Sequence, residues 1–293
     1  MEKNNTEEES NRIAEFTERF INQTNRSIFL TGKAGTGKTT LLRKIVESTH
    51  KQAIIVAPTG IAALNAGGVT IHSFFQLPFA TFIPDFKISA TFNQGLNLES
   101  KSTLLHHFKM NGVKKALYRN LELLIIDEVS MLRADVLDAM DWSLRNVRKI
   151  NEPFGGVQVL FIGDLLQLPP VVKPAEWNYL KDYYNGIYFF NSKVVLENPP
   201  LYVELEKIYR QSDPHFVRIL NNLRNNEITS SDVKHLNQYV NPDFDAIQYD
   251  DYITITTHNR DADGINANAL EQLKTNEVKY EAEVTGNFPE HLF

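Results

Sequence analysis

The glycine-rich segment at residues 32–39, GKAGTGKT, constrains the fold of this chain more than any other feature. It fits the pattern G-x-x-x-x-G-K-[ST] and follows an apolar run, residues 27–31, that is typical of a buried strand. The residues from 38 to about 48 have the pattern of a helix. Between a strand and a helix, such a loop surrounds phosphate groups with backbone N–H groups and with the positive end of the helix dipole. The sequence therefore predicts a nucleotide-binding loop.

The residue types in this loop suit the binding of ATP. We expect Lys38 to reach the β- and γ-phosphates and the Thr39 hydroxyl to bind Mg²⁺. A chance glycine-rich turn is the alternative, and the flanking strand and helix argue against it. The residues expected to hold the nucleotide are those of the loop and the start of its helix: Gly32, Ala34, Gly35, Thr36, Gly37, Lys38, Thr39 and Thr40.

Two adjacent carboxylates, Asp127 and Glu128, follow the apolar run at residues 121–126. Such a pair at the end of a buried strand commonly completes a phosphate-loop site. Asp127 would hold Mg²⁺ directly or through water, and Glu128 would orient and deprotonate the attacking water. Glu128 therefore favours hydrolysis of the nucleotide over transfer to a small acceptor. Without the upstream loop, the pair would equally suit a polar strand end that begins a turn.

The apolar runs predict an α/β fold. Their near-continuous hydrophobicity is typical of parallel strands covered on both faces, and helix-like segments lie between them. The runs are residues 27–31, 52–57, 121–126 and 157–162. We expect the first helix to begin at a capping box formed by Thr6 and Glu9. Residues 78–109, rich in Phe, Pro, Thr and Asn, interrupt the alternation and are interpreted as a surface excursion.

We expect two domains, residues 1–198 and residues 199–293. The second contains a strand pattern at 201–205 and a helical stripe at 216–223, and further along a strand at 252–257 and a helix at 261–273. These elements are too few to close a second sheet. The hypothesis is therefore a fragment whose second domain is incomplete.

The composition and charge of the chain exclude several classes of site and of protein. The chain has 293 residues, a net charge of −6 and no cysteine, which excludes disulfides and thiolate zinc sites. It has no apolar run of about eighteen residues, so no membrane span is expected. Residues 1–10 are acidic, unlike a signal peptide, which favours a cytoplasmic protein, or a nuclear or mitochondrial one in a eukaryote. The negative charge means that any DNA site must be a local groove of backbone and hydroxyl donors.

Two further segments have a functional and a structural interpretation. Residues 163–170, GDLLQLPP, place an Asp and a Gln after a strand, where they can sense the γ-phosphate; an ordinary turn stopped by Pro-Pro is the alternative. Residues 57–73, APTGIAALNAGGVTIHS, offer backbone amides and hydroxyls to the phosphates of a DNA strand. Taken by itself, the second segment is better explained as a capped helix followed by a glycine turn.

Together these segments resemble the PIF (petite integration frequency) family of helicases, relatives of the RecD-type 5′-to-3′ superfamily-one enzymes. The resemblance runs from residue 27 onward. Its most specific part is residues 138–171, DAMDWSLRNVRKINEPFGGVQVLFIGDLLQLPPV, here called the signature segment. Residues 57–73 resemble the family's strand-binding motif, and residues 205–224, LEKIYRQSDPHFVRILNNLR, resemble its fourth motif.

The resemblance implies an ATP-driven DNA helicase with two RecA-like domains, ATP in the cleft and single-stranded DNA across the top. Such enzymes act in replication, repair, recombination or telomere maintenance. Gln167 would read the γ-phosphate and Arg210 would be an arginine finger. The implied DNA contacts are Pro58, Thr59, Gly60, His72 and Ser73. A small wedge, near residues 64–78 or within residues 78–118, would split the duplex.

The chain departs from the family pattern in two ways. Asn11 stands where the family usually has an adenine-reading Gln, with Gln23 further on, and the later family motifs would lie beyond Phe293. We expect a monomer that works on single-stranded, forked or structured DNA, and a fragment that binds ATP but hydrolyses it weakly. The alternatives are a phosphate-loop kinase, an AAA-type remodelling ATPase, and a nucleotide- and strand-binding module without turnover.

Overall fold

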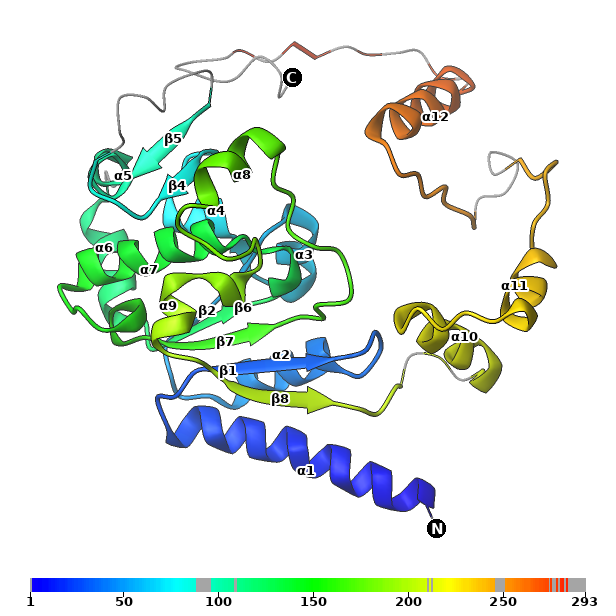
Figure 1. The fold of residues 1–293 in the computed structure, drawn as a ribbon, viewed down its shortest axis with the longest axis horizontal. Coiled ribbons are helices and arrows are strands. Elements are labelled where there is room, and N and C mark those ends of the chain that lie inside the picture. Colours follow the sequence, from blue (N-terminus) through cyan, green and yellow to red (C-terminus); the bar gives the residue numbers. More distant parts are fainter. Residues whose placement is uncertain are drawn as a thin grey trace. The chain divides into compact units, whose positions relative to one another are not determined.

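The computed structural model describes residues 2–87, 96–107, 110–209, 211, 213–245, 251–273, 275, 278, 280, 281 and 283 (Figure 1). The chain forms two compact units, Met1–Glu227 and Ile228–Phe293. In the second unit the helices are α11 (Ser230–Asn237) and α12 (Asn259–Glu271), and α12 confirms the helix predicted at residues 261–273. Among the described helices, none combines the length and the hydrophobicity needed to cross a membrane.

The first unit is built on a six-stranded sheet with the strand order β3-β2-β6-β7-β1-β8. Every pair of neighbouring strands is parallel, which confirms the predicted α/β fold class. The strands are β1 (Ile28–Gly32), β2 (Ala53–Ala57), β3 (Val69–Thr70), β6 (Leu123–Ile126), β7 (Gln158–Ile162) and β8 (Leu201–Leu205). The four central strands coincide with the four apolar runs of the sequence.

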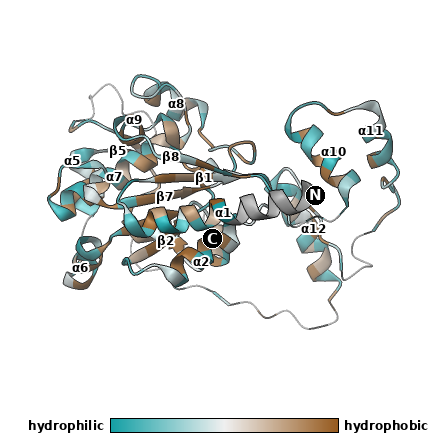
Figure 2. Cartoon of the chain, turned by 90° about the horizontal axis from the view of Figure 1, so that it is seen from below, coloured by the Kyte–Doolittle hydropathy of each residue, from teal (hydrophilic) through white to brown (hydrophobic). Residues whose placement is uncertain are grey.

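Helices cover both faces of this sheet, and each face has its own hydrophobic core (Figure 1). One face is covered by α1 (Glu2–Gln23), α2 (Lys38–Ser48) and α3 (Gly60–Ala66), and the other by α4 (Ile71–Phe75), α6 (Gly112–Asn120), α7 (Ala134–Arg148) and α9 (Lys193–Glu197). Side chains alternate along each strand, so Ile28 and Leu30 pack on one face and Phe29 on the other. Figure 2 shows the largely hydrophobic strands between helices that contain both hydrophobic and hydrophilic residues.

The strand at residues 201–205 does not start a second domain. β8 pairs in parallel with β1 from Ile28 opposite Leu201 to Gly32 opposite Leu205. The predicted boundary at residue 198 is therefore wrong, because a short strand obtains backbone hydrogen-bond partners by joining an existing sheet edge. The first unit continues through α10 (Pro214–Arg224), which confirms the predicted helical stripe, and ends at Glu227.

Other expectations also need correction. Helix α1 begins at Glu2, upstream of the capping box proposed at Thr6. Residues 252–257 form no strand, and in the described part of the chain no strand pairs with them. Residues 78–109 are more than a surface excursion, because their described part contains a parallel two-stranded sheet and buried side chains at Phe82 and Leu104. Its elements are β4 (Thr81–Ile83), β5 (Leu98–Ser100) and α5 (Lys101–His107).

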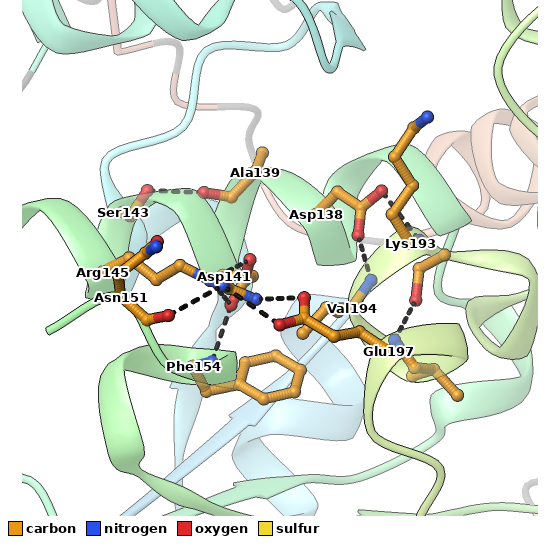
Figure 3. A network of polar contacts seen from close by, with 12 residues as sticks. Asp138, Ala139, Asp141, Ser143, Arg145, Asn151, Phe154, Lys193, Val194 and Glu197 are labelled. Carbon is orange, nitrogen blue, oxygen red and sulfur yellow. Dashed lines mark hydrogen bonds and ion pairs between the residues drawn. The ribbon is translucent and has the colours of Figure 1, made fainter.

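The start of the signature segment, residues 138–148, lies in α7 and ties this helix to neighbouring backbone (Figure 3). Asp141 accepts a hydrogen bond of 2.6 Å from the Phe154 N–H and pairs with Arg145 at 2.8 Å. Asp138 accepts N–H bonds from Lys193 and Val194, each 3.0 Å long. Burial raises the pKa of Asp141 to about 6, against the opposing effect of Arg145. These bonds position the turn before β7 and the start of α9, away from the carboxyl ends of the strands.

We expect Arg148→Ala to destabilise the first unit by about 2–4 kcal/mol. The Arg148 guanidinium donates to the carbonyl oxygens of Gly155 (2.7 Å), Tyr118 (2.6 Å), Arg119 (2.8 Å) and Leu121 (2.9 Å). The substitution leaves these partly buried acceptors without that donor, and each such loss costs about 1–3 kcal/mol before water compensates. Urea unfolding measures the effect. The matched control, Arg119→Ala on exposed surface, should change the free energy of unfolding by less than about 0.5 kcal/mol.

Candidate nucleotide site

The connections that follow β1, β6, β7 and β8 meet at one edge of the sheet. In a parallel sheet the carboxyl ends of the strands share an edge, and ligands commonly bind there. Together with α10, these connections line a cavity of about 780 Å³. This volume falls within the range of about 300–1,000 Å³ that is typical of small-molecule sites.

The phosphate loop connects β1 to α2 as predicted. Helix α2 begins at Lys38, and the residue before it, Gly37, has a φ of 88°, in the left-handed region that favours glycine. Gly32 lies so close to β8 that a Cβ atom there would be 2.5 Å from the carbonyl oxygen of Leu205. The loop residues from Lys33 to Thr40 line the cavity, with Gly32 at the end of β1 beneath them. The structure thus brings the predicted nucleotide-binding residues together.

Lys38 lies at the centre of this loop. Its Nζ donates to the carbonyl oxygens of Gly32 at 2.7 Å and of Lys33 at 3.1 Å. Burial lowers the pKa of Lys38, and the negative charges of Asp164 and Glu128 oppose that shift. The loop therefore holds a lysine ammonium close to carboxylates in a partly desolvated cavity, where charge interactions are stronger than in water.

The carboxylate pair follows β6, next to the loop. Asp127 is 9% exposed and accepts the Glu128 N–H at 3.0 Å. Glu128 lines the cavity and has a φ of 51°, a left-handed conformation that costs a non-glycine residue on the order of 1–3 kcal/mol and is found preferentially at functional sites. Burial raises the pKa of both side chains, and the charge of Asp127 raises that of Glu128 further. A raised pKa makes Glu128 a stronger proton acceptor.

The connection after β7, residues 163–170, is here called the sensor loop. Gln167 lines the cavity as predicted, and its Nε2 donates to Asp164 Oδ2 at 3.1 Å. Asp164 is 1% exposed and also accepts the Leu166 N–H at 3.1 Å and a hydrogen bond from Arg224 of α10. Burial alone would raise the pKa of Asp164, but the hydrogen bonds from Arg224 and Leu166 lower it. The sensor loop is therefore anchored by a charged carboxylate.

Asp164 was predicted, with Gln167, to sense the γ-phosphate, but two other residues at this cavity, Arg224 and Tyr209, were not predicted from the sequence. Arg224 had no local signal, because it is 60 residues from Asp164 in the sequence. Tyr209 donates its N–H to the Gly35 carbonyl at 2.7 Å, and its ring would lie 3.8 Å from a Cβ atom at Gly37. Arg210 lies outside the described residues, between the cavity-lining Tyr209 and Gln211.

The predicted DNA-contacting residues lie at the same edge of the sheet but do not line the cavity. Pro58, Thr59 and Gly60 follow β2, and Thr59 caps α3 by accepting the Ala62 N–H at 3.2 Å. His72 and Ser73 lie in α4, which follows β3, the strand next to β2. The ring of His72 stacks on Phe79 with a centroid distance of 4.7 Å.

Two basic side chains, His72 and Lys114, lie at the predicted DNA-contacting residues. Burial lowers the pKa of His72, and the charge of Arg133 adds to that effect. Lys114 of α6 donates from Nζ to the Ser73 carbonyl at 3.2 Å and adds a cation to this group. The five predicted residues thus follow two adjacent strands, and their contact with DNA stays a prediction.

The oxygens near the phosphate loop suit Mg²⁺. Thr39 is the second residue of α2 and Asp127 directly follows β6. Mg²⁺ prefers oxygen ligands of this kind together with phosphates. Within the described ranges, His, Asp and Glu side chains form no group of three that would hold a metal by themselves. Of the two candidates for reading adenine, Gln23 is exposed at the end of α1, and the Asn11 side chain lies outside the described part.

Comparison with known proteins decides the family. The model of the PIF1-like helicase family matches residues 5–233. This chain belongs to the PIF1-like helicase family. Among its relatives, the ATP-dependent DNA helicase PIF1 of Candida albicans is 33% identical over 273 residues. That match covers 90% of this chain and 28% of the Candida protein, so the chain spans about a quarter to a third of the length of the first curated relatives.

Solved PIF1-like structures share the fold. The crystal structure of the Pif1 helicase from Bacteroides in complex with ADP-AlF3 and single-stranded DNA has a TM-score of 0.80 and 40% identity, covering 96% of this chain and 61% of its own. A structure of two coordinating Pif1 helicases at forked double-stranded DNA gives the same TM-score and identity over 95% of this chain and 62% of its own. The predicted RecA-like fold and the predicted PIF-family resemblance are therefore confirmed.

Proposed function

We propose that this chain forms the ATP site and part of the DNA-binding surface of a PIF1-like helicase that moves 5′ to 3′ on single-stranded DNA. The observation that carries the proposal is the convergence of Lys38, Glu128 and Gln167 on one cavity at the carboxyl edge of a parallel sheet. The Bacteroides relative, described in complex with ADP-AlF3 and single-stranded DNA, supports the same pair of ligands here.

The proposed chemistry follows from the positions of the side chains. Lys38 turns from the loop carbonyls to the β- and γ-phosphates of ATP, and Gln167 reads the γ-phosphate. Thr39 and Asp127 would hold Mg²⁺, which neutralises charge on the phosphates when bound. Glu128 orients a water and takes its proton, a role that its raised pKa favours. Arg210 remains our proposal for an arginine finger.

Three alternatives to an ATP-hydrolysing helicase were considered from the sequence: a kinase, an AAA-type ATPase and a binding module without turnover. Membership of the PIF1-like family excludes the kinase and AAA-type alternatives. A binding module without turnover differs from the proposed enzyme by one property, hydrolysis. We therefore expect ATP to be hydrolysed by this chain in a single-turnover assay, and single-stranded DNA to increase the rate. A chain that binds ATP but leaves it intact, with and without DNA, would support the binding module.

The DNA-binding proposal rests on residues 58–60 and 72–73, which follow two adjacent strands. We propose that they hold the phosphates of a single strand and that the protein acts as a monomer on forked or structured DNA during replication, repair, recombination or telomere maintenance. Of the two candidate segments for the wedge that splits the duplex, we propose the one that contains β4 and β5. Its competitor includes α4, which buries Ile71, Phe74 and Phe75 in the core. The cellular compartment would be the cytoplasm in a bacterium, or the nucleus or mitochondrion in a eukaryote.

Salt dependence tests the DNA-binding surface. Each Lys or Arg that neutralises a phosphate contributes a slope of about −0.7 to the plot of log affinity against log salt for single strands. Lys114 is bonded to the Ser73 carbonyl and supplies a positive charge beside the proposed DNA contacts. We therefore expect a shallow slope, no steeper than about −1.4, and an affinity that depends little on the DNA sequence. Lys114→Ala should flatten the slope by about 0.7.

The matched control is Lys115→Ala, which changes the neighbouring exposed lysine of α6 and should leave the slope unchanged. Fluorescence anisotropy with a labelled oligonucleotide measures both variants. A wild-type slope steeper than about −3, or equal effects of the two substitutions, would place the strand in a different, more cationic groove.

A further inference from the structure

The contact between Arg224 and the sensor loop joins two parts of the cavity wall. Arg224 is the last residue of α10, and its Nη1 donates to Asp164 Oδ2. The same oxygen accepts from the Gln167 side chain at 3.1 Å, so Arg224 and Gln167 share one acceptor atom. Leu220, Asn221 and Leu223 of α10 also line the cavity, which places the end of this helix at the site.

Asp164 needs a cationic partner at this position. It is almost fully buried, and burying a carboxylate without a partner costs several kcal/mol. Two other charged groups in the described part of the chain interact with it: Lys38, which already lies among the carbonyls of the phosphate loop, and Glu128, which has the same sign as Asp164. Without Arg224, Asp164 would lose the cation that fixes it and would no longer hold Gln167 in one direction.

We propose that Arg224 is a positioning residue: by holding Asp164, it fixes the Gln167 amide toward the γ-phosphate. This inference rests on the proposed ATP site and adds to it a residue outside the phosphate loop, the carboxylate pair and Gln167. Arg224 would therefore contribute to the preference for ATP over ADP. Recognition of the γ-phosphate would depend on Arg224, whereas binding of the α- and β-phosphates would not.

The test compares two ligands on the 293-residue chain, fluorescent ADP and fluorescent ATPγS. Arg224→Ala should lower the affinity for ATPγS about tenfold and change the affinity for ADP by less than about twofold. The tenfold loss corresponds to about 1.4 kcal/mol. Arg224→Lys, which keeps the charge, should recover part of the loss. Arg218→Ala, on the same helix but bonded to His215, is the matched control and should leave both affinities unchanged.

A double-mutant cycle tests whether Arg224 acts through Gln167. Adding Arg224→Ala to Gln167→Ala should weaken ATPγS binding by less than about twofold, because the group that Arg224 positions is already gone. Additive losses would show that Arg224 contacts the phosphate itself, and equal losses for ADP and ATPγS would show a general structural role. Either result overturns the positioning role while leaving the ATP site in place. A wild-type chain that binds neither ligand overturns the proposed function together with this inference.

Discussion

Glu128→Gln is expected to slow ATP hydrolysis by about two to four decades while ATP binding is retained. The amide keeps the shape of the side chain and its place at the cavity, but it cannot accept the proton of the attacking water. Loss of a general base typically has an effect of this size. A single-turnover assay with radiolabelled ATP and single-stranded DNA measures the rate, and fluorescent ATPγS measures binding in the same preparation.

The matched control for this variant is Glu122→Gln, which changes a glutamate just before β6. Its Oε2 accepts the Gln52 N–H at 2.9 Å, and an amide oxygen can take over that bond. Since Glu122 precedes the strand whose other end carries Glu128, we expect no change in hydrolysis rate. If Glu128→Gln instead abolished ATP binding and left the rate of hydrolysis of bound ATP unchanged, its assignment as the base would be wrong.

Lys38→Ala is expected to weaken ATP binding by about two to three decades without unfolding the chain. Hydrogen bonds to charged groups contribute about 1.5–3 kcal/mol each, and a lysine that reaches both the β- and γ-phosphates makes at least two. The fold should persist, because the Lys38 side chain contacts loop carbonyls and no core cluster. Isothermal titration with ATP and circular dichroism measure the two properties.

Lys33→Ala provides the comparison, because Lys33 belongs to the same loop and also lines the cavity. Its backbone carbonyl, which accepts from Lys38 and Thr36, is unaffected by the substitution. We expect a loss of affinity of less than about fivefold, a surface-charge effect. Equal losses for the two variants would mean that general positive charge, rather than the placement of the Lys38 ammonium, retains the nucleotide.

Much of the fold was predictable because hydrophobic patterns report burial directly. The central strands β1, β2, β6 and β7 are covered on both faces. Burial on both faces leaves a nearly continuous apolar run in the sequence of each strand. β8 has a mixed pattern, with Leu201 and Tyr202 exposed, because it lies at an edge. A pattern of this kind predicts a strand but does not say which sheet the strand joins, and the predicted domain boundary was wrong for that reason.

The candidate site was predictable where its residues are adjacent in the sequence. The loop around Lys38 and the pair Asp127 and Glu128 each combine a motif with a strand end, and the structure brings both to one cavity. The pairing of Asp164 with Arg224 joins distant segments and depends on the fold of α10 against the sensor loop. No local pattern records such a contact, so a single arginine at a helix end is indistinguishable from a surface charge.

The placement of β8 has a mechanical consequence. β8 is aligned in parallel with β1 along five consecutive residue pairs, and the chain beyond Leu205 leads directly to the wall of the cavity. Tension applied to that following segment acts along the strand axis. The hydrogen bonds between the two strands then bear the load together in shear, instead of opening one after another. The phosphate loop is thus joined to the downstream segment by a stiff coupling, which can transmit displacement in either direction while the sheet stays intact.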